Sequence, residues 1–150
     1  MSAVAGNALT EFALIFPLFI LMVCAIADLS RIFYAEITLQ NAMRQGGRYA
    51  TVGLHQPDPQ HQGQNLSRVA SIKQITQQAA LGLSTSNVQI SSATGGSGNA
   101  GGPGDTVTLS MSSSVKLLTP IISQFFTNGS YYFTVSYSGK NEPFPPAQTN

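Results

Sequence analysis

Few side chains in this 150-residue chain could do acid–base or nucleophilic chemistry, because only 9% of its residues are charged. Its two histidines, His55 and His61, flank a Pro-Asp-Pro turn without a cysteine or acidic cluster beside them, so solvated loop histidines are favoured over a metal site. No G-x-S-x-G motif and no phosphate-binding loop ending in G-K-S/T is present. The sequence predicts a protein that is not an enzyme and uses no metal, cofactor or small-molecule substrate.

Glu11 is the acidic residue with the most unusual surroundings. It stands at the edge of an apolar run, where an ionised carboxylate is costly unless water or a cation reaches it. No Lys or Arg lies within two helical turns of it in the sequence. Two interpretations follow: Glu11 reaches the water of the headgroup region, or it pairs with a cation from outside its own helix.

Asp28 and Arg31 are the second candidate pair. Residues three apart lie on the same face of a helix, so their side chains can form an ion pair at the end of the apolar run. The pair could simply end a membrane span, or it could contact a neighbouring subunit in a helical bundle.

The apolar run that positions these residues covers residues 8–27, with Glu11 as its only charged residue. At about 1.5 Å of rise per residue, a helix of this length spans about 30 Å, the thickness of the hydrocarbon core of a bilayer. We therefore expect a membrane-spanning helix, which Pro17 bends mildly. Cys24, the only cysteine, cannot form an intrachain disulfide.

Beyond residue 27 the pattern becomes amphipathic, which predicts that the same helix continues as a rod to about residue 50. The Gly46-Gly47 pair is expected to weaken it, and Gly53 to end it. We expect the apolar stripe of this rod to pack on the following domain. The stripe consists of Leu29, Ile32, Phe33, Ile37 and Met43.

The remaining residues predict a small α+β domain with one helix packed on a three-stranded, mainly antiparallel sheet. The helix is expected within residues 65–83, with Arg68 on its polar side. Alternating patterns predict strands at 87–93, 105–115 and 130–138. The glycine-rich run 95–104 would join the first two strands as a flexible loop, and a short helix is expected within residues 119–126.

The first fifty residues carry several motifs in a characteristic order. They are Gly6 with Glu11 five positions later, Glu-Phe-Ala-Leu at 11–14, Pro17-Leu18, Asp28 with Arg31, Phe33-Tyr34, and Ala-Met-Arg-Gln-Gly-Gly-Arg-Tyr-Ala at 42–50. In these motifs the chain resembles the TadE-like pseudopilins of tight-adherence (Tad) systems, within the type IV pilin class. The resemblance is specific for the N-terminal helix, and the following hundred residues share only the general form.

The resemblance implies cleavage by a prepilin peptidase between Gly6 and Asn7, and an assembly role for Glu11, Phe12, Pro17, Asp28 and Arg31. The new amine of Asn7, on the same or a neighbouring subunit, would then be the cation that Glu11 needs. Implied partners are the membrane, the prepilin peptidase, other pilin-like subunits and an assembly platform with its ATPase. With a net charge of +1 and no basic patch, nucleic acid is not an expected partner.

The predicted organisation follows from these points. It is a leader at 1–6, a transmembrane and assembly helix at 7–50, a linker at 51–64, an α+β domain at 65–140 and a proline-rich tail at 141–150. We expect a single-pass protein of the bacterial inner membrane with an extracytoplasmic C-terminal domain, available for incorporation into a pilus.

Two alternatives concern processing and orientation. The leader has no Lys or Arg, and the positive residues beyond the span would by themselves place the C-terminal side in the cytoplasm. The apolar run could instead be a secretory signal cleaved near residues 24–27. The chain could also be an uncleaved single-pass protein whose external domain binds a ligand or another protein.

Overall fold

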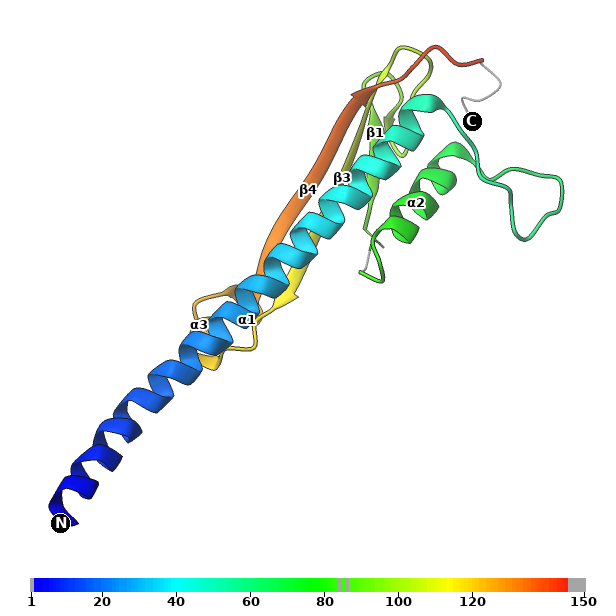
Figure 1. The fold of residues 1–150 in the computed structure, drawn as a ribbon. Helices are drawn as coiled ribbons and strands as arrows, with labels where there is room; N and C mark the ends of the chain where they lie inside the picture. Colours follow the sequence, from blue (N-terminus) through cyan, green and yellow to red (C-terminus); the bar gives the residue numbers. More distant parts are fainter. Residues whose placement is uncertain (1, 84, 86, 146–150) are drawn as a thin grey trace. The chain divides into compact units, whose positions relative to one another are not determined.

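The computed structural model describes residues 2–83, 85 and 87–145, with side chains from Ala8 onward. The chain divides into two compact units. The first, which we call the span unit, comprises Met1–Tyr34 and Ser114–Tyr131, and the second, the sheet unit, comprises Ala35–Ser113 and Tyr132–Asn150. The elements are α1 (Ser2–Val52), α2 (Arg68–Ala79), β1 (Gln89–Ser92), β2 (Gly96–Ser97), β3 (Thr106–Lys116), α3 (Pro120–Ser123), the 3-10 turn η1 (Thr127–Gly129) and β4 (Ser130–Lys140) (Figure 1).

The sheet has the strand order β2-β1-β3-β4. β1 pairs antiparallel with β2 and with β3, with Ile90 opposite Leu109. β4 also runs antiparallel to β3, because hydroxyl pairs join Thr108 to Ser138 at 3.3 Å and Ser112 to Thr134 at 3.1 Å. The predicted α+β fold is confirmed, with a fourth strand because two residues of the glycine-rich run pair with β1.

One face of the sheet carries the core of the sheet unit. Along β3 the burial alternates, so that Val107, Leu109 and Met111 point into the core while hydroxyl side chains between them face outward. The core also receives Leu39 from α1 and Ile72 from α2, so both helices cover the same face. In the sheet unit α2 lies beside the C-terminal part of α1 (Figure 1). The buried positions therefore define two layers, helices over sheet.

The part of α1 in the sheet unit packs mainly through small residues. Gly46 and Gly47 are buried, and a Cβ atom on Gly47 would lie 2.1 Å from the ring of Tyr137. On Gly46 it would lie 2.0 Å from the hydroxyl of Thr76 on α2. The glycine pair thus permits close approach to both the sheet and α2, and α1 continues through it to Val52. Gly53, at a φ of 73°, follows as the terminating residue.

The predicted apolar stripe was wrong for most of its members. Only Met43 enters the core, whereas Leu29, Phe33 and Ile37 are each more than half exposed. The buried face instead consists of Ala35, Thr38, Leu39, Ala42, Met43, Gly46, Gly47 and Ala50. The reason is steric, because a helix that approaches a sheet closely needs small side chains at the contact.

The helix α2 is capped by Ser67, whose hydroxyl accepts from the Ala70 N–H at 3.3 Å. Ile72 is buried as predicted, but the placement of Arg68 on a polar side was wrong, because Arg68 is only 1% exposed. Its guanidinium donates to the carbonyl of Ala50 at 2.7 Å and to that of Gly101. Arg68 therefore serves as a cation at the C-terminal end of α1, where such a charge is favourable.

The segments after α1 and after β4 make contacts of their own, although residues 146–150 of the predicted tail lie outside the described residues. In the loop after α1, a backbone bridge joins Pro57 to Asn65, and His61 pairs with Asp58 at 2.8 Å. In the tail, residues 141–145 form no helix or strand, yet Asn141 and Phe144 are buried. Both segments belong to the sheet unit.

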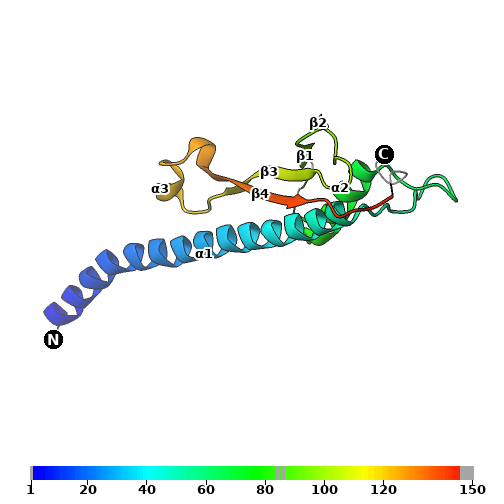
Figure 2. The same cartoon turned by 90° about the horizontal axis from the view of Figure 1, so that it is seen from above.

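The span unit contains the N-terminal part of α1, the end of β3, α3 and η1. Figure 2 shows that α1 bends in its N-terminal part, which includes Pro17. Proline has no N–H to donate and its ring displaces the preceding turn, which accounts for a bend in an otherwise continuous helix. α3 lasts only four residues and begins with Pro120 at its first position.

Candidate membrane and assembly surface

The apolar run of α1 is exposed along most of its length. In the described part of the chain, one helix combines the length and apolar composition needed to cross a bilayer, and it begins near the N-terminus. Leu9, Leu14 and Leu18 are 70%, 80% and 68% exposed. A surface of this kind is unfavourable in water, so lipid or other apolar helices are its natural surroundings.

The N-terminal motif residues lie along this exposed helix. Glu11 is exposed, and within the described residues it takes part in no ion pair. Phe12 stacks on Phe16 with ring centroids 5.2 Å apart. Gly6 and Asn7 belong to α1, and the structure describes side chains only from Ala8 onward. The cation that Glu11 would need therefore stays a prediction.

Asp28 and Arg31 form the predicted pair, with 3.7 Å between Arg31 Nη1 and Asp28 Oδ1. Both side chains also hold the segment between β3 and α3. Asp28 Oδ1 accepts from the Leu118 N–H at 2.7 Å, and Oδ2 accepts from the Thr119 N–H at 2.9 Å and the Thr119 hydroxyl at 2.7 Å. Arg31 donates to the carbonyl of Lys116 at 3.1 Å. The pair thus ties residues 116–119 to α1.

Burial distinguishes the two members of this pair. Asp28 is 3% exposed, whereas the side chain of Arg31 is 47% exposed. Three donors satisfy the buried carboxylate, so its charge is stabilised mainly by hydrogen bonds. Thr119 is the N-cap of α3, but its hydroxyl donates to Asp28 and makes no side-chain cap. Sequence reasoning placed Thr119 at the start of a short helix but missed its contact with Asp28.

A stripe of large apolar residues continues on α1 beyond the end of the span. Leu29, Phe33 and Ile37 follow one another at intervals of four residues and are 52%, 53% and 58% exposed. Residues at this spacing share one face of a helix. We call these three residues the exposed stripe. The exposed stripe follows the apolar run directly in the sequence of α1.

Residues 6–48 match the family model TadE, TadE-like protein. The resemblance inferred from the motifs is therefore confirmed for the N-terminal helix. No curated protein and no solved structure matches the chain. The TadE-like segment and its single apolar helix fit a membrane-anchored, pilus-related protein.

Within the TadE-like segment the motifs separate into two groups by their surroundings. Asp28, Ala42, Gly46 and Gly47 are buried and contact the rest of the chain, so they hold this molecule together. Glu11, Phe12 and the exposed stripe are instead exposed, and Pro17 lines an apolar groove. The second group is exposed and is therefore accessible to lipid or to other molecules.

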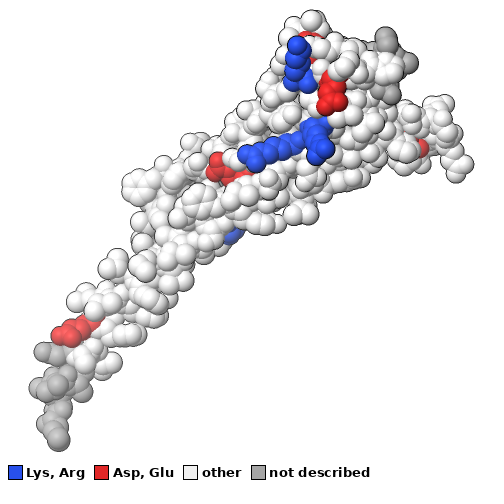
Figure 3. Space-filling model, turned by 45° about the horizontal axis from the view of Figure 1, so that its top comes forward, with Lys and Arg blue, Asp and Glu red and all other residues white. Residues whose placement is uncertain are grey.

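Two charged residues of the sheet unit, Arg68 and Asp105, make hydrogen bonds within it. Burial lowers the pKa of the Arg68 guanidinium, and Asp105 opposes that shift. The hydrogen bond from the Thr94 hydroxyl, 2.5 Å long, is the main reason that the pKa of Asp105 is below its usual value. The Arg68 guanidinium also lies 4.5 Å from the ring centroid of Phe144. Figure 3 shows that most of the surface in view carries neither Lys or Arg nor Asp or Glu.

Proposed function

We propose that the chain is a minor pilin or pseudopilin of a Tad-type pilus or secretion system. A membrane-bound aspartate prepilin peptidase would cleave it between Gly6 and Asn7. The product would be held in the bacterial inner membrane, with its C-terminal domain extracytoplasmic, until other pilin-like subunits, a platform protein and a secretion ATPase assemble it. Its chemistry would be packing and ion pairing rather than turnover.

The observation that supports this proposal most is the exposed stripe within the TadE-like segment. A single-pass anchor needs an apolar surface only over the thickness of the bilayer, about twenty residues. Here Phe33 and Ile37 continue that surface for about two to three further turns and stay exposed. A helix of this kind is suited to leave the lipid and pack against the helices of other subunits.

Glu11 fits the same role through electrostatics. A carboxylate in an apolar bundle is tolerated when a cation neutralises it. In the proposed cleavage product, the α-amine of Asn7 lies one turn before Glu11 on the same helix or reaches it from a neighbouring subunit. Assembly would then bury the amine and the carboxylate together, so that a subunit without either group would assemble poorly.

The N-terminal sequence of the chain isolated from membranes tests the processing step. We expect the mature chain to begin at Asn7 and a Gly6→Phe variant to retain the preceding residues, because a bulky side chain would obstruct the peptidase. An Ala3→Phe variant, with the same bulk three residues earlier, should still be processed. Recovery of the unaltered chain with Met1 or Ser2 at its N-terminus would count against the proposal.

The alternative is an uncleaved single-pass protein whose extracytoplasmic domain binds a ligand. A hollow of about 450 Å³ between α1 and α2 favours this reading, since Asn41, Gln45 and Gln78 line it beside Leu81. This alternative predicts an intact N-terminus and full function in a Glu11→Ala variant. The proposed pilin role predicts normal membrane levels of that variant but its loss from assembled filaments.

A further inference from the structure

The segment that Asp28 holds has an unusually apolar surface. We call residues 117–126 the α3 loop. Leu118, Ile121 and Phe125 are 63%, 57% and 84% exposed, and no charged residue occurs between Lys116 and Lys140. Three large apolar side chains gathered on one short loop are uncommon on a surface that only water contacts.

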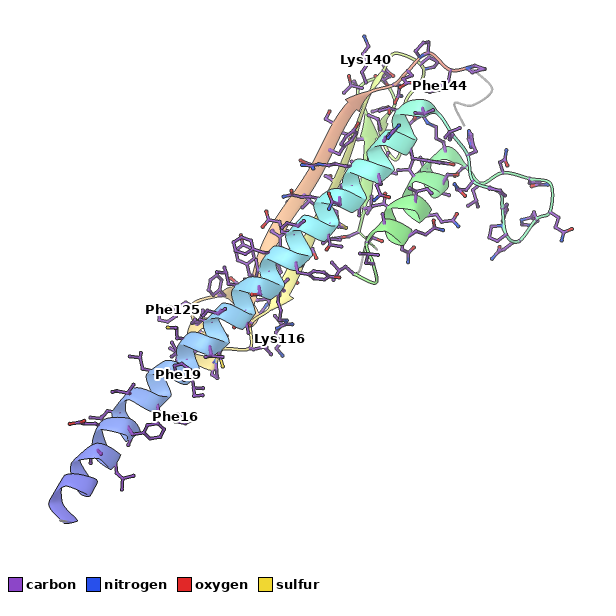
Figure 4. All side chains as sticks on the ribbon, in the orientation of Figure 1. Phe16, Phe19, Lys116, Phe125, Lys140 and Phe144 are labelled. Atoms are coloured by element: carbon purple, nitrogen blue, oxygen red, sulfur yellow. The ribbon has the colours of Figure 1, made fainter. Side chains whose placement is uncertain are left out.

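The α3 loop lies against the apolar run of α1. A groove of about 370 Å³ separates them, with Thr119, Pro120 and Ile121 on the loop side. On the helix side it is lined by Phe16, Pro17, Ile20, Leu21 and Cys24. Figure 4 labels Phe125 on the loop, and Phe16 and Phe19 on the part of α1 in the same unit.

The position of this groove sets the depth of the loop relative to the span. All its helix-side residues belong to the run 8–27, and Asp28, which anchors the loop, directly follows that run. Phe16 precedes Asp28 by twelve residues, or about 18 Å along a helix. If the run lies in hydrocarbon, then the loop residues that face it lie within the same leaflet.

The backbone of the α3 loop is suited to such a place. Irregular backbone in an apolar medium is costly unless its polar groups find partners. The Leu118 and Thr119 N–H groups donate to Asp28, Leu117 donates to the Gly129 carbonyl at 2.9 Å, and Pro120 has no N–H. Further along, Ser123, Phe125 and Phe126 donate to carbonyls within the loop. Asp28 therefore supplies the acceptors for the Leu118 and Thr119 N–H groups.

We propose that the α3 loop inserts into the lipid beside α1, as a second contact with the membrane that does not span it. The loop is surrounded by the acyl chains of one leaflet, because its apolar surface lies against the apolar run of α1. Arg31 and Lys116, both exposed, then lie at headgroup level, where cationic side chains are favourable. This proposal rests on the membrane placement of α1, and it adds a constraint on the rotation of that helix.

Single tryptophans test the insertion directly, since the natural chain has none. The full chain carrying Phe125→Trp would be reconstituted in phosphatidylcholine and phosphatidylglycerol vesicles, with and without bromine on the acyl chains. Phe19→Trp reports the span, and Tyr132→Trp, at a 56% exposed position of the sheet unit, reports water. We expect brominated lipid to quench the first two variants strongly, with blue-shifted emission, and to leave the third unchanged.

Each contrary result has a distinct meaning. If brominated lipid quenches Phe19→Trp but not Phe125→Trp, loop insertion is overturned and the membrane placement of α1 stands. If it quenches neither variant, both loop insertion and the membrane placement of α1 are overturned. Blue-shifted but unquenched emission from Phe125→Trp would mean that protein, such as a second copy, covers the loop, and would also overturn the proposal. Leu118→Trp repeats the measurement at a second exposed position, so a local defect at residue 125 cannot decide the result.

Discussion

At the scale of single residues, Asp28 makes the contact with the clearest consequence. Its two oxygens accept three hydrogen bonds from Leu118 and Thr119. An asparagine has the same shape but only one acceptor oxygen, and its NH2 group would face a donor. We expect Asp28→Asn to cost about 1–3 kcal/mol locally. Hydrogen exchange of the Leu118 and Thr119 amides should therefore become about 5- to 150-fold faster.

Arg31→Ala is the matched control for Asp28→Asn. Arg31 contributes one hydrogen bond to Lys116 and a 3.7 Å ion pair, and its side chain is 47% exposed. Pairs of this kind contribute about 0–1 kcal/mol. Exchange at Leu118 should change less than in Asp28→Asn, and the reverse order would show that Arg31, not Asp28, holds the α3 loop.

Arg68 offers a second prediction at this scale, in the sheet unit. Replacing it with methionine keeps an apolar stem but leaves the Ala50 and Gly101 carbonyls without their donor. At about 1 kcal/mol or more for each acceptor, we expect a loss of at least about 2 kcal/mol. The midpoint temperature of thermal unfolding, measured on the full chain in detergent, should fall by about 4–8 °C. Lys73→Met, at an exposed position of α2, should leave the midpoint nearly unchanged.

Of Asp28 and Arg68, sequence reasoning could identify only Asp28. Asp28 and Arg31 are three apart on a strongly predicted helix, so their pairing follows from helical geometry. The bonds from Asp28 to residues about ninety positions later could not be foreseen, because two of the three donors are backbone N–H groups that every residue but proline has. Arg68 sits among polar residues of an amphipathic pattern, and nothing local indicates its burial.

At the scale of elements, α1 was predicted well in extent and poorly in orientation. The apolar run and its continuation indicated a helix over 7–50, and the helix observed is Ser2–Val52. The periodic pattern ranked the largest apolar side chains as the buried face. The real contact uses Ala42, Gly46 and Gly47, which carry little hydrophobic signal. Close packing selected small residues at most of these positions beside Leu39 and Met43, and Leu29, Phe33 and Ile37 were left exposed.

The glycine pair in α1 gives a prediction that opposes helix propensity. Gly47→Ala should stabilise an isolated helix by about 1 kcal/mol, but the added Cβ would lie 2.1 Å from the Tyr137 ring. We expect a net destabilisation of about 1–3 kcal/mol in denaturant unfolding of the full chain. Asn41→Ala, at an exposed position of the same helix, should change stability by about 0.5 kcal/mol or less.

A double variant distinguishes this steric cause from a general weakness of the helix. Tyr137→Ala removes the ring that the new Cβ would meet, so the two changes should cost less together than the sum of their separate effects. Strictly additive costs would mean that Gly47 is needed for some reason other than its approach to β4.

At the scale of the whole molecule, the exposed apolar surface is not spread evenly. The outward face of the sheet carries hydroxyl pairs such as Thr108 with Ser138, which water solvates well. The large exposed apolar residues are instead concentrated on α1 and on the α3 loop. A molecule that stayed alone in water would gain nothing from this distribution. This distribution suits the proposed pilin role, in which α1 would exchange lipid for protein during assembly.

The exposed stripe tests that view, because it can be changed without touching the core. Ile37→Arg puts a charge at a 58% exposed position of α1, so thermal unfolding should stay nearly unchanged. In cells we expect the variant to reach the membrane but to be lost from filaments sheared from the surface, since a charge cannot be buried cheaply between apolar helices. Tyr132→Arg, at a similarly exposed position of β4, should still be incorporated. Normal incorporation of both variants would mean that subunits do not pack along the stripe, and loss of both would point to a general intolerance of surface charge.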